Sequence, residues 1–298
     1  MPYVPSGVRG RPPIDPVKRA EYDARKLAMV SPAAAMMAVD ASADETDQEI
    51  VARIDSRYTF MDKLSHGVAK GFIRAAVVSG AGGLGKTYTI ERVMEHYKQN
   101  EPGFKVEMVK GKMTPINLYM KLYEMRDPNC IIVLDDTDAV WDDEDSLGIL
   151  KAALDTGDSR LVSWMSLSHA LAGAGVPTSF HYNGSLLFIS NLNFDRMIAS
   201  GGRRAAHLEA IATRVTFLDL KVHSAREKML WVEFTVRKHH MLKQDGLNDA
   251  QTDEVLKWMR EHRDSLRSIS IRQAKQIAGL VHTYGDEWKE AATVFQCK

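Results

Sequence analysis

The sequence predicts an α/β fold: a five-stranded parallel sheet built on a phosphate-binding loop, followed by a small all-helical unit. A glycine-rich stretch at residues 79–87 follows an apolar run and precedes a helical pattern, the setting that such a loop requires. Apolar, β-rich runs alternate with helical patterns between residues 73 and 220, as in a parallel sheet with helices on both faces. After residue 220 only helical patterns follow.

The composition is that of an ordinary globular protein of 298 residues, enough for one or two domains with a substantial core. Lys+Arg and Asp+Glu both number 39, so no overall basic field indicates a nucleic-acid binder, although a local basic loop remains open. The two cysteines, Cys130 and Cys297, match no metal spacing and suggest no disulfide framework. Without a membrane-length apolar run or a secretory signal, we expect a cytoplasmic protein that binds no membrane.

Residues 1–46 predict a flexible N-terminal arm, because prolines crowd its first part and acidic residues its end. The alternative is an arm that tethers subunits or binds a protein partner. Apolar residues at helical spacing then predict a helix over residues 47–67, which either covers a nucleotide base or packs on the sheet. We place an α/β nucleotide-binding domain at residues 47–221 and a helical lid domain at residues 222–298.

The glycine-rich loop carries the residue types that phosphate binding needs. Glycines admit positive φ, so backbone N–H groups can surround an anion, and the following helix N-terminus adds partial positive charge. Lys86 can reach the β- and γ-phosphates, and the Thr87 hydroxyl can hold Mg²⁺. We therefore predict ATP and Mg²⁺ as ligands, the alternative being a glycine turn with an unrelated lysine. The predicted nucleotide-binding residues are Gly80, Ala81, Gly82, Gly83, Leu84, Gly85, Lys86, Thr87 and Tyr88.

Five apolar runs predict the strands, and the segments between them predict the helices of the α/β part. Thr114 and Pro115 form a favourable helix N-terminus. The segment at residues 161–183 is either a β-hairpin packed on the sheet or an insertion that contacts a protein substrate. The expected strands lie at residues 73–78, 104–109, 130–134, 186–190 and 215–220, and the helices between them at residues 88–99, 114–126 and 145–154.

Acidic residues follow the strand at residues 130–134, whose continuous apolar run is typical of a central buried strand. The C-terminal tip of such a strand faces the ligand crevice. Asp135 is therefore predicted to hold Mg²⁺, through water, and Asp136 to orient or deprotonate the attacking water. Asp138 is the alternative base, and the remaining acidic residues of this segment fit a solvated loop.

Three further polar residues have positions that suit a nucleotide site. Asn191 ends the strand at residues 186–190 and could hydrogen-bond the γ-phosphate or the attacking water; a turn-forming Asn is the alternative. Arg214 precedes the last strand and could reach the nucleotide of a neighbouring subunit, with Arg203 and Arg204 as rivals. Arg272 opens a helix of the lid and could sense loss of the γ-phosphate. Each arginine could instead be a solvated surface residue.

The C-terminal part carries clear helix signals. Ser224 and Glu227 form a capping box that opens a long helix, and Asn248 is suited to cap the next one. A stripe of apolar residues at i, i+3, i+4 and i+7 from Ala274 predicts a last helix. The tryptophans of this region, Trp231, Trp258 and Trp288, suit the core of the helical unit.

The order of these features resembles that of the AAA+ ATPases, over about residues 47–290. The resemblance implies an ATP hydrolase that works as a homo-oligomer, a hexameric ring with shared active sites. It makes residues 80–87 the Walker A motif, Asp135 and Asp136 the Walker B pair, Asn191 sensor 1, Arg214 the arginine finger and Arg272 sensor 2. The family usually has Glu where this chain has Asp136, which puts fast hydrolysis in doubt. The residues at 134–138 and 187–193 also resemble AAA+ proteins of tailed phages, which would mean a host-cytoplasmic viral protein.

The resemblance leaves several functions open. The loop at residues 110–114 would face the pore of a ring, and its two lysines suit a phosphate backbone; with the basic arm, they favour a motor or loader for DNA in replication or recombination. A protein-remodelling chaperone is the second hypothesis, and a slow nucleotide-gated switch the third. A P-loop ATPase of the RecA kind that forms no ring is disfavoured by the helical unit after the sheet.

Overall fold

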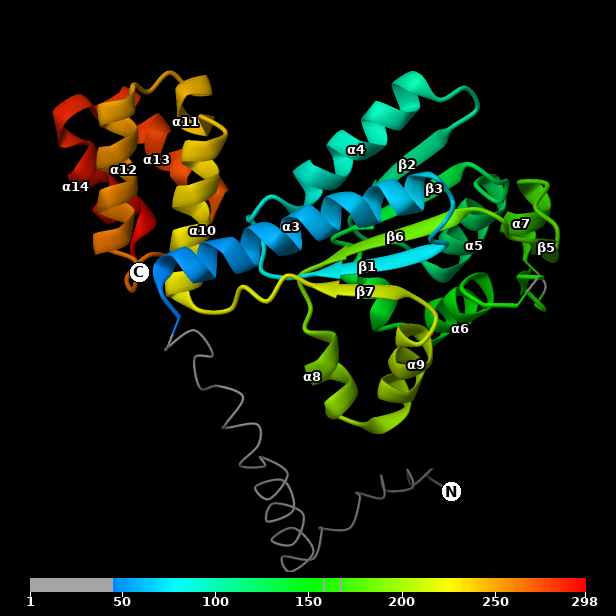
Figure 1. Ribbon diagram of the computed structural model, residues 1–298. Helices are drawn as coiled ribbons and strands as arrows, with labels where there is room; N and C mark the ends of the chain where they lie inside the picture. Colours follow the sequence, from blue (N-terminus) through cyan, green and yellow to red (C-terminus); the bar gives the residue numbers. More distant parts are fainter. Residues whose placement is uncertain (1–44, 158, 167) are drawn as a thin grey trace, which may run out of the picture. The chain divides into compact units, whose positions relative to one another are not determined.

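A computed structural model describes residues 45–298 except residues 158 and 167, so the predicted arm at residues 1–46 lies almost entirely outside the described residues. Residues 47–298 form one compact unit, in which an α/β part is followed by a group of helices (Figure 1). The predicted domain boundary between residues 221 and 222 remains a prediction. It falls in the connection between the last strand of the sheet and the first helix of the C-terminal group.

The sheet has five parallel strands in the order β2-β3-β6-β1-β7, which confirms the predicted fold class. All residues of β1, β3 and β6 are buried, whereas the edge strands β2 and β7 are partly exposed. The strands are β1 (Ala75–Ser79), β2 (Lys105–Lys110), β3 (Cys130–Asp135), β6 (Ser185–Ser190) and β7 (Thr216–Asp219). Because the strands are parallel, their carboxyl ends meet along one edge of the sheet.

Helices cover both faces of the sheet, as predicted. Alternation along β1 sends Ala76 and Val78 into one apolar core and Ala75 and Val77 into the other. The first core is covered by α3 (Asp47–Ala69) and α4 (Lys86–Asn100), and the second by α5 (Pro115–Glu124), α6 (Glu144–Ala153), α8 (Phe194–Ala199) and α9 (Gly202–Ala212). A 3₁₀ turn, η1 (Asp138–Trp141), follows β3. The Thr114 side chain accepts a hydrogen bond from the Asn117 N–H, which confirms it as the N-cap of α5.

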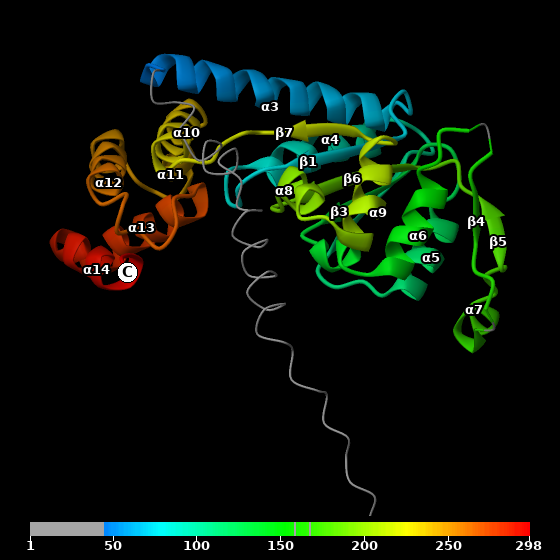
Figure 2. The ribbon, with the colours of Figure 1, turned by 90° about the horizontal axis from the view of Figure 1, so that it is seen from below.

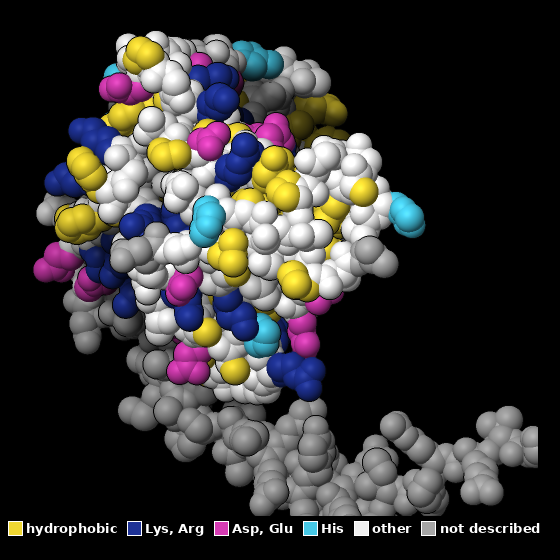
Figure 3. Space-filling model, turned by 90° about the vertical axis from the view of Figure 1, so that its right-hand side faces the viewer, with side chains coloured by type: hydrophobic (Ala, Val, Ile, Leu, Met, Phe, Trp, Pro, Cys, Tyr) yellow, Lys and Arg dark blue, Asp and Glu magenta, His cyan; other side chains and the backbone are white. Residues whose placement is uncertain are grey.

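The segment between α6 and β6 contains the predicted β-hairpin. Strands β4 (Leu161–Ser163) and β5 (Ser179–His181) pair antiparallel, and α7 (His169–Gly173) lies between them in sequence (Figure 2). The hairpin packs on the sheet's helices, since the rings of Phe180 and Tyr119 of α5 lie 5.1 Å apart. The side chain of Met165, in the connection between β4 and α7, is 89% exposed. On the face viewed in Figure 3, basic side chains are interspersed with acidic and apolar ones, so no uniform charge marks it.

The C-terminal helices are α10 (Ala225–Lys238), α11 (Met241–Gln244), α12 (Asp249–Glu261), α13 (Ile271–Tyr284) and α14 (Trp288–Gln296), with the 3₁₀ turn η2 (Gly285–Glu287) before α14. The predicted capping box at Ser224 and the predicted N-cap at Asn248 are confirmed, and the three tryptophans predicted for the core are buried. The helix predicted to be last, α13, is followed by α14, because Gly285 at φ 52° ends the pattern of α13 and a new helix begins. None of the helices in the described part of the chain could span a membrane.

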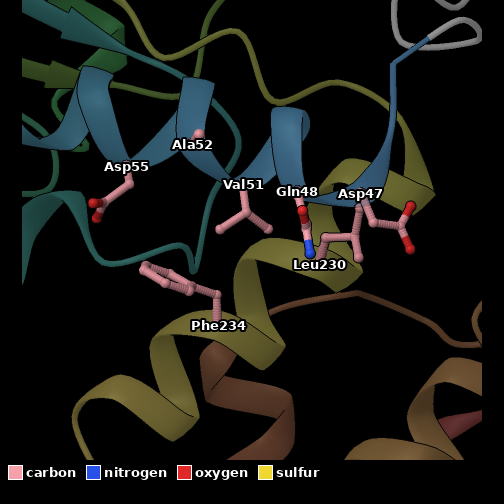
Figure 4. Close-up of a pocket in the computed structure, with 7 residues that line it drawn as sticks. All are labelled: Asp47, Gln48, Val51, Ala52, Asp55, Leu230 and Phe234. Atoms are coloured by element: carbon pink, nitrogen blue, oxygen red, sulfur yellow. The ribbon is translucent and has the colours of Figure 1, made fainter.

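Helix α3 of the α/β part lies beside α10 of the helical group. A groove of about 410 Å³ runs between them, and Val51, Leu230 and Phe234 face one another across its apolar floor (Figure 4). Its lining residues are Asp47, Gln48, Val51, Ala52, Asp55, Leu230 and Phe234. An ion pair between Lys238 and Asp55, at 2.9 Å, also joins the two helices.

Glu227 is the buried polar centre of this joint. Its carboxylate accepts hydrogen bonds from the backbone N–H groups of His223 and Ser224, at 2.9 and 2.8 Å, and from Arg53 of α3 at 2.6 Å. Burial alone would raise the pKa of Glu227, but the hydrogen bonds from Ser224, Arg53 and His223 outweigh it and lower the pKa below the ordinary value of 4.5. The ionised carboxylate therefore stabilises the fold.

We expect Glu227→Gln to lower the free energy of unfolding by about 1–3 kcal/mol at pH 7, because an amide cannot accept from three donors as a carboxylate does. The unfolded state binds this proton more tightly, so the stabilisation is present above pH 4.5 and is lost as the pH falls through the lowered pKa. Urea unfolding between pH 7 and pH 3 should show the two proteins converging. Glu290→Gln, at an exposed position of α14, is the control; a difference that stays constant with pH would contradict this account.

Candidate nucleotide-binding site

The phosphate loop, defined here as residues 80–87, leaves the carboxyl end of β1 and enters the first turn of α4. Gly83 and Gly85 have φ angles of 72° and 99°, in the left-handed region that other residues adopt only with strain. A Cβ at Gly83 would lie 2.6 Å from the Cβ of Ser270, so the close approach of the helical group also requires glycine here. The loop therefore has the glycine-dependent conformation that the sequence predicts.

Lys86 is held inside the loop. Its ammonium group donates to the carbonyl oxygens of Gly80 and Ala81, at 2.7 and 2.9 Å, and to Asn191 Oδ1 at 2.9 Å. Burial lowers the pKa of Lys86 to about 8, although the nearby carboxylates of Asp136 and Asp135 act in the opposite direction. The cation thus lies at the centre of the site with all three donors used.

Thr87 and Asp135, the two residues predicted to hold Mg²⁺, lie together. The Thr87 hydroxyl donates to the two carboxylate oxygens of Asp135 at 3.2 and 3.1 Å. Burial raises the pKa of Asp135, while the hydrogen bond from Thr87 opposes this shift. Lys110, at the end of β2, lies 3.8 Å from Asp135 Oδ2 and 2.7 Å from Glu91 Oε1. One of the two lysines expected to contact a polymer is therefore engaged with acidic groups beside the site.

Asn191 joins the basic and acidic parts of the site. Its side-chain oxygen accepts from Lys86, and its Nδ2 donates to Asp136 Oδ1 at 2.7 Å. Strand β6, which ends just before Asn191, lies between β1 and β3, so its tip falls between the phosphate loop and the acidic pair. Asp136 itself is exposed and has a φ of 50°, an unusual conformation for a residue other than glycine.

Asp138 is a second carboxylate at this edge. Its Oδ1 accepts a hydrogen bond of 2.7 Å from the hydroxyl of Ser190, the last residue of β6. Burial raises the pKa of Asp138, and the hydrogen bond from Ser190 opposes that shift. The alternative base named by the sequence is therefore part of the same cluster as Asp136.

Arg214 does not join this cluster. It precedes β7, which runs parallel to β1 from Thr216 to Asp219, so Arg214 lies at the edge of the sheet opposite the phosphate loop. Its side chain donates to the Ala210 carbonyl at 2.5 Å, and its Nε is 3.9 Å from Asp155. The rival residues pair with acidic residues on other elements, Arg203 with Glu144 and Arg204 with Asp142.

Arg272 lies in the first turn of α13, close in the chain to residues that contact the phosphate loop. The Ile271 N–H donates to the Gly83 carbonyl at 2.9 Å, and Ser270 packs against Gly83. The Arg272 side chain itself is exposed. The start of α13 is therefore beside the loop, but the Arg272 guanidinium makes no hydrogen bond or ion pair with the described residues of the loop.

The remaining loop residues differ in their exposure. The side chain of Leu84 is buried in the core, so only its backbone can contribute to the site. Tyr88 is 60% exposed and lines a groove of about 630 Å³ between α4 and β2. Three contacts with the site were not predicted from the sequence. Tyr58 and Trp231 contact the Leu84 carbonyl, and Lys110 contacts Asp135. A buried indole or phenol signals that it needs a hydrogen-bond partner, but the sequence does not say which one.

The residues present fit MgATP. Thr87 and Asp135 supply the hard oxygen ligands that Mg²⁺ prefers, and Lys86 supplies the cation for phosphate. Within residues 45–298, apart from the two gaps, no group of three His, Cys, Asp or Glu residues could hold a metal ion. Mg²⁺ usually keeps several waters and shares substrate phosphates, so a pair of protein oxygens is the donor set expected of a nucleotide-bound ion.

The parallel sheet, the phosphate loop and the C-terminal helices together define a P-loop α/β protein with an added helical unit. The chain belongs to the family of a protein of Enterobacteria phage T4, the uncharacterized 36.7 kDa protein in the nrdC–mobD intergenic region. The two sequences are 36% identical over 250 residues, which cover 84% of this chain and 76% of the T4 protein. No family model matches the chain.

Solved structures show a weaker likeness. Domain III of the Thermotoga maritima replication initiation protein DnaA has 13% identity and a TM-score of 0.44, over 80% of this chain and 87% of that one. NtrX from Brucella abortus, in complex with ATP, has 13% identity and a TM-score of 0.46, over 91% and 57%. PCH-2 of C. elegans has 13% identity and a TM-score of 0.33, over 83% and 64%. At these scores, the fold class depends on the strand order and loop of this chain itself.

Proposed function

We propose that this chain is an AAA+ ATPase of the phage type, which binds and hydrolyses ATP in the host cytoplasm. The observation that carries the proposal is the continuous hydrogen-bonded set at one edge of the sheet. Lys86, Asn191 and Asp136 form one chain of contacts, and Thr87 with Asp135 forms a second beside it. The phage relative supports the viral assignment. Recovery of the protein in the membrane fraction of infected cells would overturn the location.

The residues of the site would divide the work of hydrolysis. Backbone N–H groups of the loop and the Lys86 ammonium bind and orient the phosphates. Thr87 and Asp135 would hold Mg²⁺, which supplies charge neutralisation on the phosphate oxygens when bound. Asn191 would keep Asp136 positioned relative to the phosphates, because its side chain hydrogen-bonds both Lys86 and Asp136. An acidic residue then positions and deprotonates the attacking water.

Two carboxylates are candidates for the base. Asp136 is exposed and accepts one hydrogen bond from Asn191. Asp138 is partly buried, which raises its pKa and favours proton acceptance, and its Oδ1 accepts one hydrogen bond from Ser190. We favour Asp136, because Asn191 hydrogen-bonds both Asp136 and Lys86 and so links this carboxylate to the lysine that would bind the phosphates. Asp136 has a shorter side chain than the Glu that is usual at this position in the AAA+ family, which favours slow hydrolysis. A nucleotide-gated switch is therefore the second candidate function.

We expect the protein to bind MgATP, and Lys86→Ala to weaken binding about 10- to 100-fold, because charge-assisted hydrogen bonds to phosphate are lost. Lys98→Ala, an exposed lysine on the same helix, is the matched control and should bind as the unmodified protein does. Asp136→Asn should keep binding and reduce hydrolysis about 100-fold or more, whereas Asp138→Asn should have a smaller effect.

Isothermal titration calorimetry and phosphate release measure the two steps separately. Absence of MgATP binding by the unmodified protein would overturn the proposed function. If Asp138→Asn abolishes hydrolysis and Asp136→Asn does not, the base is Asp138. Binding without turnover in the unmodified protein would favour the switch over the motor.

We propose that subunits form a ring, hexameric by analogy with the AAA+ family, in which Arg214 serves a neighbouring subunit. Its position at the edge opposite its own phosphate loop supports a role in trans. Arg272, at the start of α13 beside the loop, would report the state of the γ-phosphate to the helical group. Mixing inactive Arg214→Ala with inactive Asp135→Ala should restore part of the ATPase activity, since some interfaces then combine an intact Arg214 from one subunit with an intact Asp135 from its neighbour. Folded variants that show no recovery would exclude this role for Arg214.

We propose DNA as the polymer on which the ring acts. Lys112 is exposed in the loop after β2, whereas its companion Lys110 is paired with Glu91 and Asp135. Lys112 is therefore the residue of that loop that suits a phosphate backbone. Protein remodelling is the alternative, and the exposed Met165 beside the β4–β5 hairpin favours it. A protein partner bound through residues 1–46 also remains a proposal.

We expect DNA to stimulate ATP hydrolysis and to bind with an affinity that falls steeply with salt, as counterion release requires. Lys112→Ala should reduce the stimulation several-fold and leave basal hydrolysis unchanged, with Lys98→Ala as the control. Fluorescence anisotropy of labelled single- and double-stranded DNA at low and moderate salt measures the binding. If neither DNA binds at low salt, the DNA proposal fails; stimulation by an unfolded protein, lost in Met165→Ala, would select remodelling.

A further inference from the structure

The carbonyl oxygen of Leu84, near the tip of the phosphate loop, accepts two hydrogen bonds from aromatic side chains. The Tyr58 hydroxyl of α3 donates to it at 2.6 Å, and the Trp231 indole N–H of α10 donates at 3.1 Å. The two rings stack on each other with their centroids 4.3 Å apart. One backbone atom of the loop is therefore held by both the α/β part and the helical group.

The carbonyl of the preceding residue, Gly83, is also hydrogen-bonded by the helical group. The Gly83 oxygen accepts from the Ile271 N–H at the start of α13. Two successive carbonyls of the loop are thus used by the helical group, through α10 and α13, while Lys86 bonds the carbonyls of Gly80 and Ala81. The first part of the loop backbone is therefore held by Lys86, and the part that follows is held by the helical group.

These contacts lie in the dry interior. Tyr58 and Trp231 are 8% and 3% exposed, and Leu84 is 1% exposed. Burial raises the pKa of Tyr58, so its hydroxyl is a permanent donor at physiological pH. A buried carbonyl that loses its only donor costs about 1–3 kcal/mol, whereas one that keeps a second donor costs much less. Either of the two donors, Tyr58 or Trp231, can therefore satisfy the Leu84 carbonyl when the other is lost.

We propose that Trp231 and Tyr58 are positioning residues of the phosphate loop, through which the helical group sets the loop's affinity for nucleotide. The proposal rests on the proposed nucleotide binding and deepens it. Both side chains would act through the Leu84 carbonyl, which belongs to the residue that precedes Gly85 and Lys86. A loop fixed in its binding geometry spends less of the binding free energy on ordering itself. Displacement of α10 would loosen the loop and release nucleotide.

The test separates positioning from a purely structural role. Trp231→Phe and Tyr58→Phe each remove one donor and keep an aromatic ring in the stack. Each single variant should weaken MgATP binding by no more than about threefold, because Leu84 keeps one donor. The double variant should weaken it by about 30-fold, well beyond the product of the singles. Trp258→Phe, a buried tryptophan of the same helical group without a contact to the loop, is the control.

Affinity is measured by calorimetry at a temperature where circular dichroism shows every variant folded. MgATP should also change the tryptophan fluorescence of the unmodified protein and of Trp258→Phe, but not that of Trp231→Phe. A double variant that binds as tightly as the unmodified protein, or whose loss equals the product of the singles, would overturn the inference. Failure of the unmodified protein to bind MgATP would instead reject the proposed function, so the two failures are distinguishable.

Discussion

The burial of the Lys86 ammonium is the constraint on which the site depends. A cation removed from water must be fully hydrogen-bonded, and here the loop carbonyls and Asn191 supply the acceptors. This requirement fixes the curl of the phosphate loop and the position of the β6 tip relative to β1. The nearby carboxylates balance the charge, although burial still lowers the pKa of Lys86. The site is therefore a compact set of opposite charges, whose arrangement depends on the strand order.

That strand order explains why the sequence predicted so much. The apolar runs identified all five strands of the main sheet. The polar residues that follow these strands predicted that Thr87 and Asp135 lie together and that Asn191 lies beside the phosphate loop. Parallel strands bring such ends together whatever their separation in sequence. Capping residues such as Ser224 and Asn248 were equally readable, since their bonds are local.

Contacts between distant elements were not predictable. Nothing in the sequence assigns Trp231 to Leu84, or Lys110 to Glu91 and Asp135, because these contacts depend on how the helical group and the edge strand pack. The helix after Gly285 was missed for a different reason, since a single positive φ interrupts the apolar period. Helix existence is local information, whereas partner choice for a buried polar atom is not.

Arg214 and the phosphate loop lie at opposite edges of one parallel sheet, so the subunit has a direction. Any contact that brings the two edges together joins unlike surfaces head to tail. If Arg214 serves a neighbouring subunit, as we propose, a two-fold symmetric dimer, which joins like surfaces, would complete neither site. An open assembly would always leave one incomplete site at its end, whereas a closed ring would leave none. Closure of the assembly would therefore itself set the number of working sites.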